Sequence, residues 1–283
     1  MVRVAGRLLP CRSVPSPLRL APVLAALTAC ASNYGPAPVS TAPDVPAGRP
    51  AVHEAPTALL SAQVLPAGPA DRDYILPVGA VVHLLFSRPI DPLTLVPQSF
   101  VLALGDGRRV APVGAFLSPG TGPGEQRSVA LLLAAPPAPT DKAAPATPPA
   151  EPLSLTVTGL LHDAAGRVLE GLAADIRPSS APVFPVRAEP GPAAACGGRG
   201  QALRVFWSGP VARTTTGPAP VVVRLDGTRG PAESQGGRSA RPVQDLCVPG
   251  VAGVQAIEFA AGAMLDERGS PAAGGALTIS PGP

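Results

Sequence analysis

The stretch "VHLLFSRPI" (82–90) decides the fold, because an altered form of it occurs later in the chain as "LRVFWSGPV" (203–211). Apolar residues, one serine and one proline occupy the same places in both stretches. Each is a short and nearly continuous apolar run, which is typical of a strand buried between two sheets. Pro89 is expected to end the first strand, because proline donates no hydrogen bond to a neighbouring strand.

Three further blocks repeat in the same order along the chain. They are "FVLALGDG" (100–107) with "VVVRLDG" (221–227), which has one residue fewer before its closing glycine; "VALLLAAP" (129–136) with "VQDLCVPG" (243–250); and "GLLHDAAGR" (159–167) with "AMLDERGS" (263–270). Four matched blocks in one order indicate two copies of a single unit. The first copy is longer, and we attribute the difference to a proline-rich insertion at 136–152.

The last pair of blocks predicts a tight turn in each copy. "DAAG" begins at Asp163 and "DERG" at Asp266, and both fit a type I turn closed by a glycine at positive φ. An aspartate at the first position can accept hydrogen bonds from the amides of its own turn. We therefore interpret both aspartates as turn formers rather than catalytic residues.

The first copy resembles a known family. "FSRPIDPLTLVPQSFVL" (86–102) and "LSLTVTGLLHDAAGR" (153–167) are similar to the SbsA-type bacterial Ig-like domain over about 62–177, apart from the insertion and a leucine, Leu153 or Leu155, where the family usually has tyrosine. The second copy, about 183–281, resembles the family only through the first. The resemblance implies a β-sandwich that serves as a spacer or binding module on cell-envelope proteins. It implies no catalytic residues.

Composition agrees with an all-β fold. The chain has 40 prolines, 31 glycines and 3% aromatic residues, and its apolar runs are short, with turn signals on both sides. We predict two tandem Ig-like β-sandwich domains: a tether over 30–61, the first domain over 62–177, a linker over 178–190 and a divergent second domain over 191–283.

The N-terminal residues predict a signal peptide at 1–29. Four arginines and no acid precede the apolar run "LAPVLAALTA" (20–29), and "LTAC" (27–30) resembles the lipobox of bacterial lipoproteins. That resemblance implies cleavage before Cys30 and acyl chains, including palmitate, on this cysteine. Ala31 and Ser32 follow it where an aspartate would favour the inner membrane, so the outer membrane is the expected location. The alternatives are an ordinary cleavable signal or a buried free cysteine.

Net charge makes a nucleic-acid partner unexpected. The formal charge of +3 falls to −1 when residues 1–29, with their four arginines, are removed. A chain so close to neutral lacks the clustered basic side chains that neutralise phosphates.

The sequence offers few residues for a metal or an active site. Its three histidines are His53 in the tether, His83, expected at a partly exposed strand position, and His162 beside Asp163. Two adjacent side chains make a weak metal site, so we expect no metal and no cofactor. Trp207 could bind a sugar or a peptide, but we favour a core position because Phe86 occupies the matching place in the first copy.

Cysteine usage predicts one disulfide. Cys11 leaves with the signal peptide and Cys30 takes lipid, which leaves Cys196 and Cys247 in an oxidising compartment. A bond between them would close a loop of roughly 50 residues and stabilise the fold by about 4 kcal/mol.

These features predict a membrane-anchored envelope lipoprotein that acts as a non-enzymatic structural or binding module. Its expected partners are the membrane, through the N-terminal lipid, and an envelope protein or polymer. The alternative is a periplasmic or surface hydrolase of envelope polymers, with catalytic residues that come from scattered loops.

Overall fold

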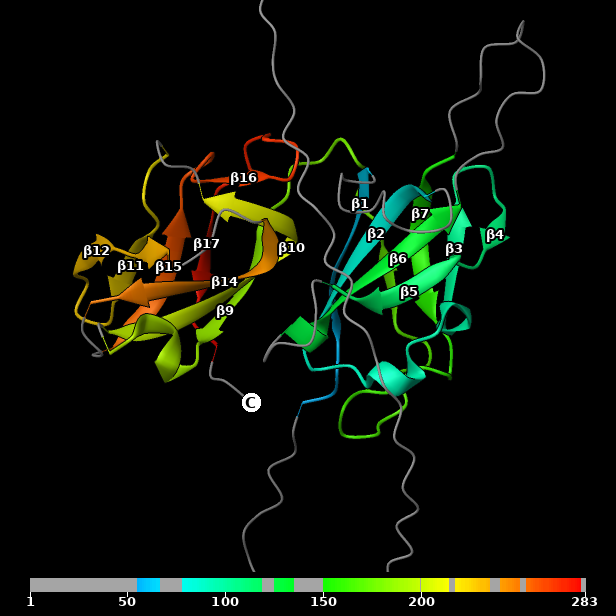
Figure 1. Cartoon of the computed structure of the whole chain (residues 1–283), viewed down its shortest axis with the longest axis horizontal. Helices are drawn as coiled ribbons and strands as arrows, with labels where there is room; N and C mark the ends of the chain where they lie inside the picture. Colours follow the sequence, from blue (N-terminus) through cyan, green and yellow to red (C-terminus); the bar gives the residue numbers. More distant parts are fainter. Residues whose placement is uncertain are drawn as a thin grey trace, which may run out of the picture. The chain divides into compact units, whose positions relative to one another are not determined.

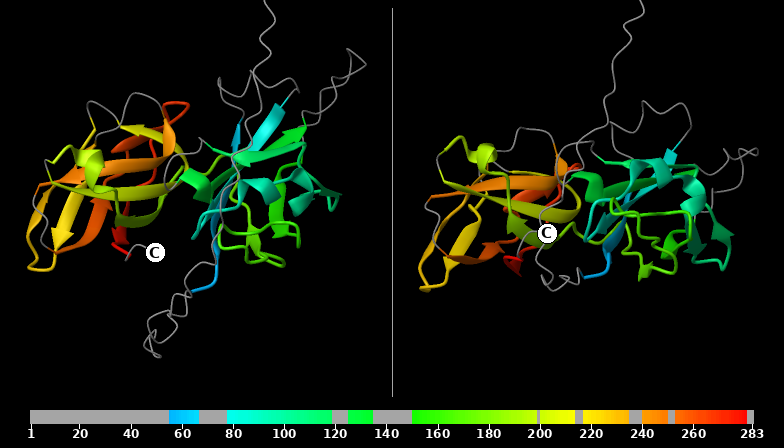
Figure 2. Two further views of the ribbon diagram at one scale, coloured as in Figure 1. Left: turned by 60° about the horizontal axis from the view of Figure 1, so that its bottom comes forward. Right: turned by 90° about the horizontal axis from the view of Figure 1, so that it is seen from below.

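The computed structural model describes residues 55–66, 78–118, 125–134, 150–198, 200–213, 217–234, 240–249 and 253–280. Within these ranges the protein is all-β, with four antiparallel sheets and only short 3₁₀ helices, namely η2 (Pro92–Thr94), η3 (Pro97–Ser99), η4 (Glu125–Arg127) and η5 (Ala193–Cys196). Residues Glu54–Pro283 form one compact unit. The strands fall into two groups along the chain, coloured blue to green and yellow-green to red (Figures 1 and 2).

The first group consists of eight strands in two facing sheets. In chain order they are β1 (Leu59–Pro66), β2 (Val78–Phe86), β3 (Phe100–Leu104), β4 (Arg109–Val110), β5 (Gly114–Leu117), β6 (Ser128–Ala134), β7 (Pro152–Val157) and β8 (Ala173–Asp175). One sheet has the order β1-β2-β6-β5 and the other β4-β3-β7-β8. Both contribute to a single apolar core, which includes Leu84 and Phe86 from one sheet and Leu102 and Leu155 from the other.

The second group repeats this plan. Its strands are β9 (Pro185–Pro190), β10 (Gln201–Arg213), β11 (Val221–Arg224), β12 (Arg229–Pro231), β13 (Glu233–Ser234), β14 (Arg241–Val248), β15 (Val254–Phe259), β16 (Met264–Asp266) and β17 (Gly275–Thr278). The sheet orders are β9-β10-β14-β13, with β16 also paired to β10, and β12-β11-β15-β17. The core between these sheets includes Leu203, Trp207, Ile257 and Phe259.

Strand order confirms the predicted duplication. If β1 to β8 are matched with β9 to β15 and β17, the two sheets of the first sandwich have the same neighbours as the two sheets of the second. The single additional element is β16, whose Asp266 pairs with Val211; in the first sandwich the matching contact is the bridge between Ile90 and Asp163. Two copies of one unit therefore follow one another in the chain.

Two details of the sequence match were wrong by one residue. Val82 pairs with Leu131, and its equivalent Leu203 pairs with Leu246. Leu131 thus corresponds to Leu246, and not to Asp245 as the block match implied. Because neighbouring strand residues point to opposite faces, this shift decides which residues enter the core: both leucines are fully buried there, whereas Asp245 lies on the outer face.

The second detail concerns the hairpin between the third and fourth strands of each copy. The backbone N–H of Gly107 donates to the carbonyl of Leu104, and that of Gly227 donates to the carbonyl of Arg224. Both turns therefore span the same number of residues. The second copy therefore does not lack a residue before Gly227, although the sequence match had predicted that it would.

Domain boundaries also differ from the prediction. Leu59 to Ser61 belong to β1, although we had assigned them to the tether, and β9 (Pro185–Pro190) lies inside the predicted linker. Prolines flank both segments, and this made them look like connecting chain. Pro152, the last residue of the predicted insertion, begins β7, and 135–149 lie outside the described residues.

The two sandwiches pack against each other through equivalent positions. Leu60 and Leu85 of the first cluster with Val186 and Phe206 of the second, and pairing shows that Leu60 corresponds to Val186 and Leu85 to Phe206. The contact therefore joins the same face of both copies.

Gly209 of β10 lies close to Leu65 of β1 and to Val183. A Cβ at Gly209 would lie 2.9 Å from Cδ1 of Leu65 and 3.2 Å from Cγ2 of Val183. Leu65 comes from β1 yet packs with the core of the second sandwich. A side chain at position 209 would therefore require the end of the Leu65 side chain to move.

Candidate functional site

The side chain of Asp163 is hydrogen-bonded within its own turn. Its Oδ1 accepts hydrogen bonds at 3.0 Å from the backbone N–H groups of Ala165 and Arg167, and Gly166 closes the turn with φ 77°. Its Oδ2 accepts from Nε of Arg167 at 2.8 Å and from the hydroxyl of Thr57 at 2.6 Å. Burial opposes ionisation, but the Thr57 hydroxyl and the donors of Arg167 outweigh it and hold the pKa of Asp163 below its ordinary value.

Asp266 makes the same bonds in the second copy. Its Oδ1 accepts from the backbone N–H groups of Arg268 at 2.9 Å and Ser270 at 2.8 Å, and Gly269 has φ 80°. Nη2 of Arg268 donates to its Oδ2 at 2.9 Å. The position of Thr57 is taken by Val183, so the hydroxyl contact exists only in the first copy. Both aspartates are turn formers, as predicted.

Ser87 and Ser208, the serines of the repeated block, form equivalent hydrogen bonds in the two copies. The hydroxyl oxygen of Ser87 accepts a hydrogen bond from the backbone N–H of Ala58 at 2.8 Å, and the backbone N–H of Ser87 donates to the carbonyl of Ala58. Ser208 and Phe184 exchange the same two bonds, both at 3.0 Å. Each serine thus fastens the residue before the first strand of its copy to the second strand, just after β2 in the first copy and within β10 in the second.

His83 and His162, the two histidines in the described residues, belong to no group that could hold a metal ion. His83 is 2% exposed, so our prediction of a partly exposed position was wrong. Burial lowers its pKa from 6.5 to about 4, and neither ring nitrogen has a partner among the described residues. His162 is half-buried in the loop before Asp163, and His53 lies outside the described residues. In the described ranges no three His, Cys, Asp or Glu side chains are grouped to hold a metal ion.

Trp207 is a core residue, as predicted. It is 1% exposed, and its ring meets that of Phe259 edge-on, with centroids 4.9 Å apart and an interplanar angle of 74°. The equivalent Phe86 is fully buried in the first sandwich. A tryptophan enclosed in this way cannot serve as a surface platform for a sugar or peptide.

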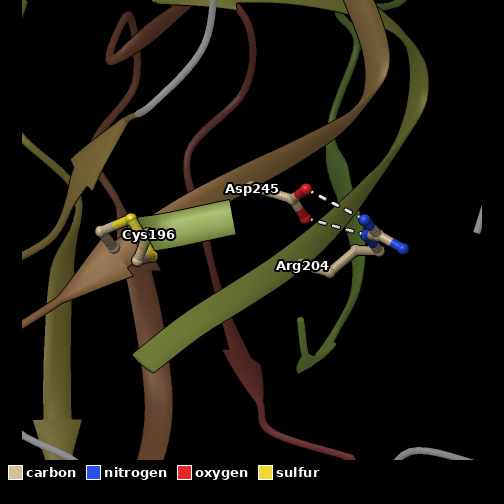
Figure 3. Close-up of a disulfide and its surroundings, with 4 residues drawn as sticks. Cys196, Arg204 and Asp245 are labelled. Atoms are coloured by element: carbon tan, nitrogen blue, oxygen red, sulfur yellow. Dashed lines mark hydrogen bonds and ion pairs between the residues drawn. A yellow bond between two sulfur atoms is a disulfide. The ribbon is translucent and has the colours of Figure 1, made fainter. Parts of the chain in front are cut away.

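The predicted disulfide is present. Cys196 and Cys247 are bonded, with Cα atoms 5.6 Å apart. The bond ties η5, which precedes β10, to β14, the strand that pairs with β10 (Figure 3). In the same figure Arg204 of β10 and Asp245 of β14 form two hydrogen bonds of 2.9 Å across the outer face of that sheet. Cys30, the predicted lipidation site, lies outside the described residues.

The contact between the sandwiches contains a buried polar group that the sequence did not indicate. Nη1 of Arg127 donates to Oε2 of Glu189 at 2.8 Å, with both side chains almost fully buried. Nε of Arg187 donates to the same oxygen at 3.0 Å. The guanidinium of Arg127 also lies 5.1 Å from the ring centroid of Phe206, which is a cation–π distance.

Gln63 adds neutral hydrogen bonds to this contact. The hydroxyl of Ser208 donates to Oε1 of Gln63 at 2.6 Å, and Nε2 of Gln63 donates to the carbonyl of Ala181 at 2.8 Å. Gln63 itself is fully buried. The residues that join the sandwiches are far apart in the chain, and no local pattern marks them as neighbours.

Comparisons with known proteins add little to these observations. No family model matches the chain, and no curated protein sequence matches it. Among solved structures, the N-terminal part of the bacterial S-layer protein SbsC is similar with a TM-score of 0.27 and 11% sequence identity. The alignment covers 79% of this chain and 44% of that chain. None of the helices in the described ranges has the length and apolar character that crossing a membrane requires.

Proposed function

We propose that the mature protein is a lipoprotein of the cell envelope, anchored through acyl chains on Cys30, and that two Ig-like β-sandwiches act as a non-enzymatic structural or binding module. The basic leader, the apolar run and "LTAC" (27–30) support the anchor. Two or more acyl chains hold a protein at a membrane for long periods. Ala31 and Ser32 favour the outer membrane.

The observation that carries the module proposal is the use of the recurring polar residues. Asp163 and Asp266 shape equivalent turns, and Ser87 and Ser208 fasten the chain before the first strand of their copies in the same way. Each of these polar residues occurs in both copies and bonds to the equivalent backbone groups in each. Their role in folding is therefore enough to explain why both copies have them. The polar positions that the two copies share therefore support a scaffold rather than a reaction.

Surfaces at the loop ends and exposed strand edges are the proposed binding sites. The proline-rich insertion joins Ala134 at the end of β6 to Pro152 at the start of β7. Ala134 pairs with Val78, at the end of the sheet away from Ser87 and Ala58. The insertion thus leaves the first sandwich opposite the point where the N-terminal chain enters.

Detergent partitioning tests the anchor. Wild-type protein should enter the detergent phase, whereas Cys30→Ala should remain in the aqueous phase or accumulate as unprocessed precursor. Cys11→Ala is the matched control, because it removes a cysteine from the leader without touching "LTAC". Equal partitioning of wild type and Cys30→Ala into the aqueous phase would remove the anchor from this proposal.

Capture of partners from membranes tests the module. Wild-type protein should retain an envelope protein or polymer, and a variant that lacks 136–149 should stay folded, because its ends are already fixed in β6 and β7. If the deletion leaves every captured partner in place, the insertion is passive. Hydrolysis of an envelope polymer by the purified protein would contradict the module and favour the enzyme.

A further inference from the structure

One end of the first sandwich carries a group of exposed aliphatic side chains. Leu93 is 89% exposed, Leu160 and Val168 are each 55% exposed, and Val96 is 37% exposed. These four are most of the large apolar side chains that the described residues expose; the others are Val113, Leu153 and Leu225. Single exposed leucines are ordinary, but a group of them indicates a contact surface.

Hydrogen bonds hold the loops that carry these side chains together. The backbone N–H of Asp91 donates to the carbonyl of His162 at 3.1 Å, and the backbone N–H of His162 donates to Oγ1 of Thr94 at 3.0 Å. The hydroxyl of Thr158 donates to the carbonyl of Gln98 at 3.0 Å. The 91–99 segment therefore lies along the start of the 158–169 loop. A bridge between His162 and Val168 joins the two sides of that loop.

The N-terminal chain enters the fold at this same end. Thr57 donates to Asp163, which lies in the 158–169 loop, and Ala58 is bonded to Ser87, shortly before the 91–99 segment. Figure 1 shows the start of β1 and the 158–169 loop together at the lower end of the first sandwich. The described chain therefore begins, at Ala55, at the end of the first sandwich that carries this surface.

The second copy does not repeat the feature. Leu265, the equivalent of His162, is half-buried, and the place of Val168 is taken by Pro271. No large apolar side chain is exposed in the described part of the corresponding loops, 211–213, 217–220 and 261–271. The aliphatic group belongs to the copy that directly follows the tether, and not to the fold that both copies share.

We propose that Leu93, Val96, Leu160 and Val168 form a docking surface for the lipid bilayer and insert at the boundary between headgroups and acyl chains. The proposal rests on the proposed lipid on Cys30, because the described chain begins at this end of the sandwich and Cys30 precedes it in the sequence. Leucine and valine are under-represented among the residues that dominate protein–protein binding, where tryptophan, tyrosine and arginine prevail. Shallow burial of aliphatic side chains is how interfacial membrane segments bind.

A fluorescent probe on the surface tests the contact. The chain from Ala31 onward contains Cys196 and Cys247 as its only cysteines, and these form the disulfide. Leu93→Cys or Leu160→Cys therefore places one thiol for an environment-sensitive label. An N-terminal histidine tag would hold the chain on vesicles of phosphatidylethanolamine and phosphatidylglycerol that contain a nickel-chelating lipid. Leu225→Cys is the matched control, since Leu225 is a 75% exposed leucine of the second sandwich.

The label at residue 93 or 160 should shift its emission to shorter wavelength on vesicles. Nitroxide lipids that carry the quencher near the headgroup should quench it at least threefold more strongly than the label at residue 225. Adding Leu93→Glu to the Leu160→Cys protein should reduce that quenching to the control level, with an unchanged circular dichroism spectrum. Equal quenching at 93 and 225 would overturn the proposal, as would a shift at 93 that needs envelope protein and not vesicles.

This test does not depend on acylation, because the chelating lipid replaces the acyl chains. Loss of the anchor in the Cys30→Ala partitioning experiment and loss of docking in the vesicle experiment can therefore be told apart. A chain that is not acylated in cells but docks on vesicles would retain the surface and lose the lipid anchor.

Discussion

Acid should destabilise this protein through one buried histidine. His83 lies in β2 between Gln63 of β1 and Ala130 of β6, on the face whose Gln63 and Leu85 contact the second sandwich. Its pKa is about 4 in the folded protein, against 6.5 for an unburied histidine, because burial disfavours the charged ring. The charged groups described in this contact are Arg127 and Arg187, which both donate hydrogen bonds to Glu189.

The sign and size of the effect follow from these two pKa values. Above pH 6.5 the ring is neutral in both the folded and the unfolded chain, so the full stability is present. Between pH 6.5 and about 4 only the unfolded chain takes up a proton, and the free energy of unfolding falls by about 1.4 kcal/mol per pH unit. The total loss attributable to His83 is about 3 kcal/mol, and it levels off below pH 4.

Urea unfolding at a series of pH values would measure this loss. His83→Leu removes the titrating ring and fills the site with an apolar side chain, while all carboxylates remain. The difference in unfolding free energy between wild type and His83→Leu should therefore change by about 3 kcal/mol between pH 7 and pH 4, in favour of the variant at low pH. A difference that stays constant over this range would show that His83 is not buried as a neutral ring.

Three other substitutions have expected outcomes that thermal or urea unfolding can check. Replacing both Cys196 and Cys247 with serine should lower the free energy of unfolding by about 4 kcal/mol, and no loss would mean that the bond does not form in the native protein. Asp163→Ala should cost about 1 kcal/mol more than Asp266→Ala because of the Thr57 hydroxyl, and the excess should vanish in a Thr57→Val background. Arg127→Met alone should lower the free energy of unfolding by about 3–5 kcal/mol, because it leaves Glu189 without its closest cation. The double variant Arg127→Met, Glu189→Leu should lose less stability than either single variant. Additive losses would argue against a coupled ion pair.

Features that depend on neighbouring residues were predictable from the sequence. The apolar runs around 82–86 and 203–207 are buried strands, Asp163 and Asp266 form the expected turns, and elimination among four cysteines identified the disulfide. Each of these rests on local chemistry or on a small set of choices. The order of the repeated blocks also carried enough information to predict the duplication.

Features that depend on what covers a sheet were not predictable. An alternating strand predicts one buried and one solvated face, and His83 was assigned to the solvated face on that basis. The second sandwich packs on this face at Leu85 and Gln63, and no residue near His83 in the chain indicates that contact. The bond between Arg127 and Glu189 joins residues far apart in the chain and could be found only with the fold in hand. We did not predict β9 because it is short and has a proline at each end, which is typical of a linker.

The cross-strand pair at His83 differs in chemistry from the equivalent pair of the second copy. His83 faces Ala130 in the first copy, and the equivalent residues of the second are Arg204 and Asp245, which form a two-pronged ion pair. Arg204 and Asp245 keep 12% and 26% of their side-chain surface exposed, so water still solvates the pair.

At position 83 the exposed fraction is 2%, and a fully ionised pair would lose its hydration with little gain over an apolar one. His83 can remain neutral and its neighbour Ala130 is small and apolar, so this pair is suited to the buried face. The charged pair suits the face that keeps contact with water. The two equivalent pairs therefore differ in charge as they differ in burial: the outer face is buried at His83 and partly solvated at Arg204 and Asp245.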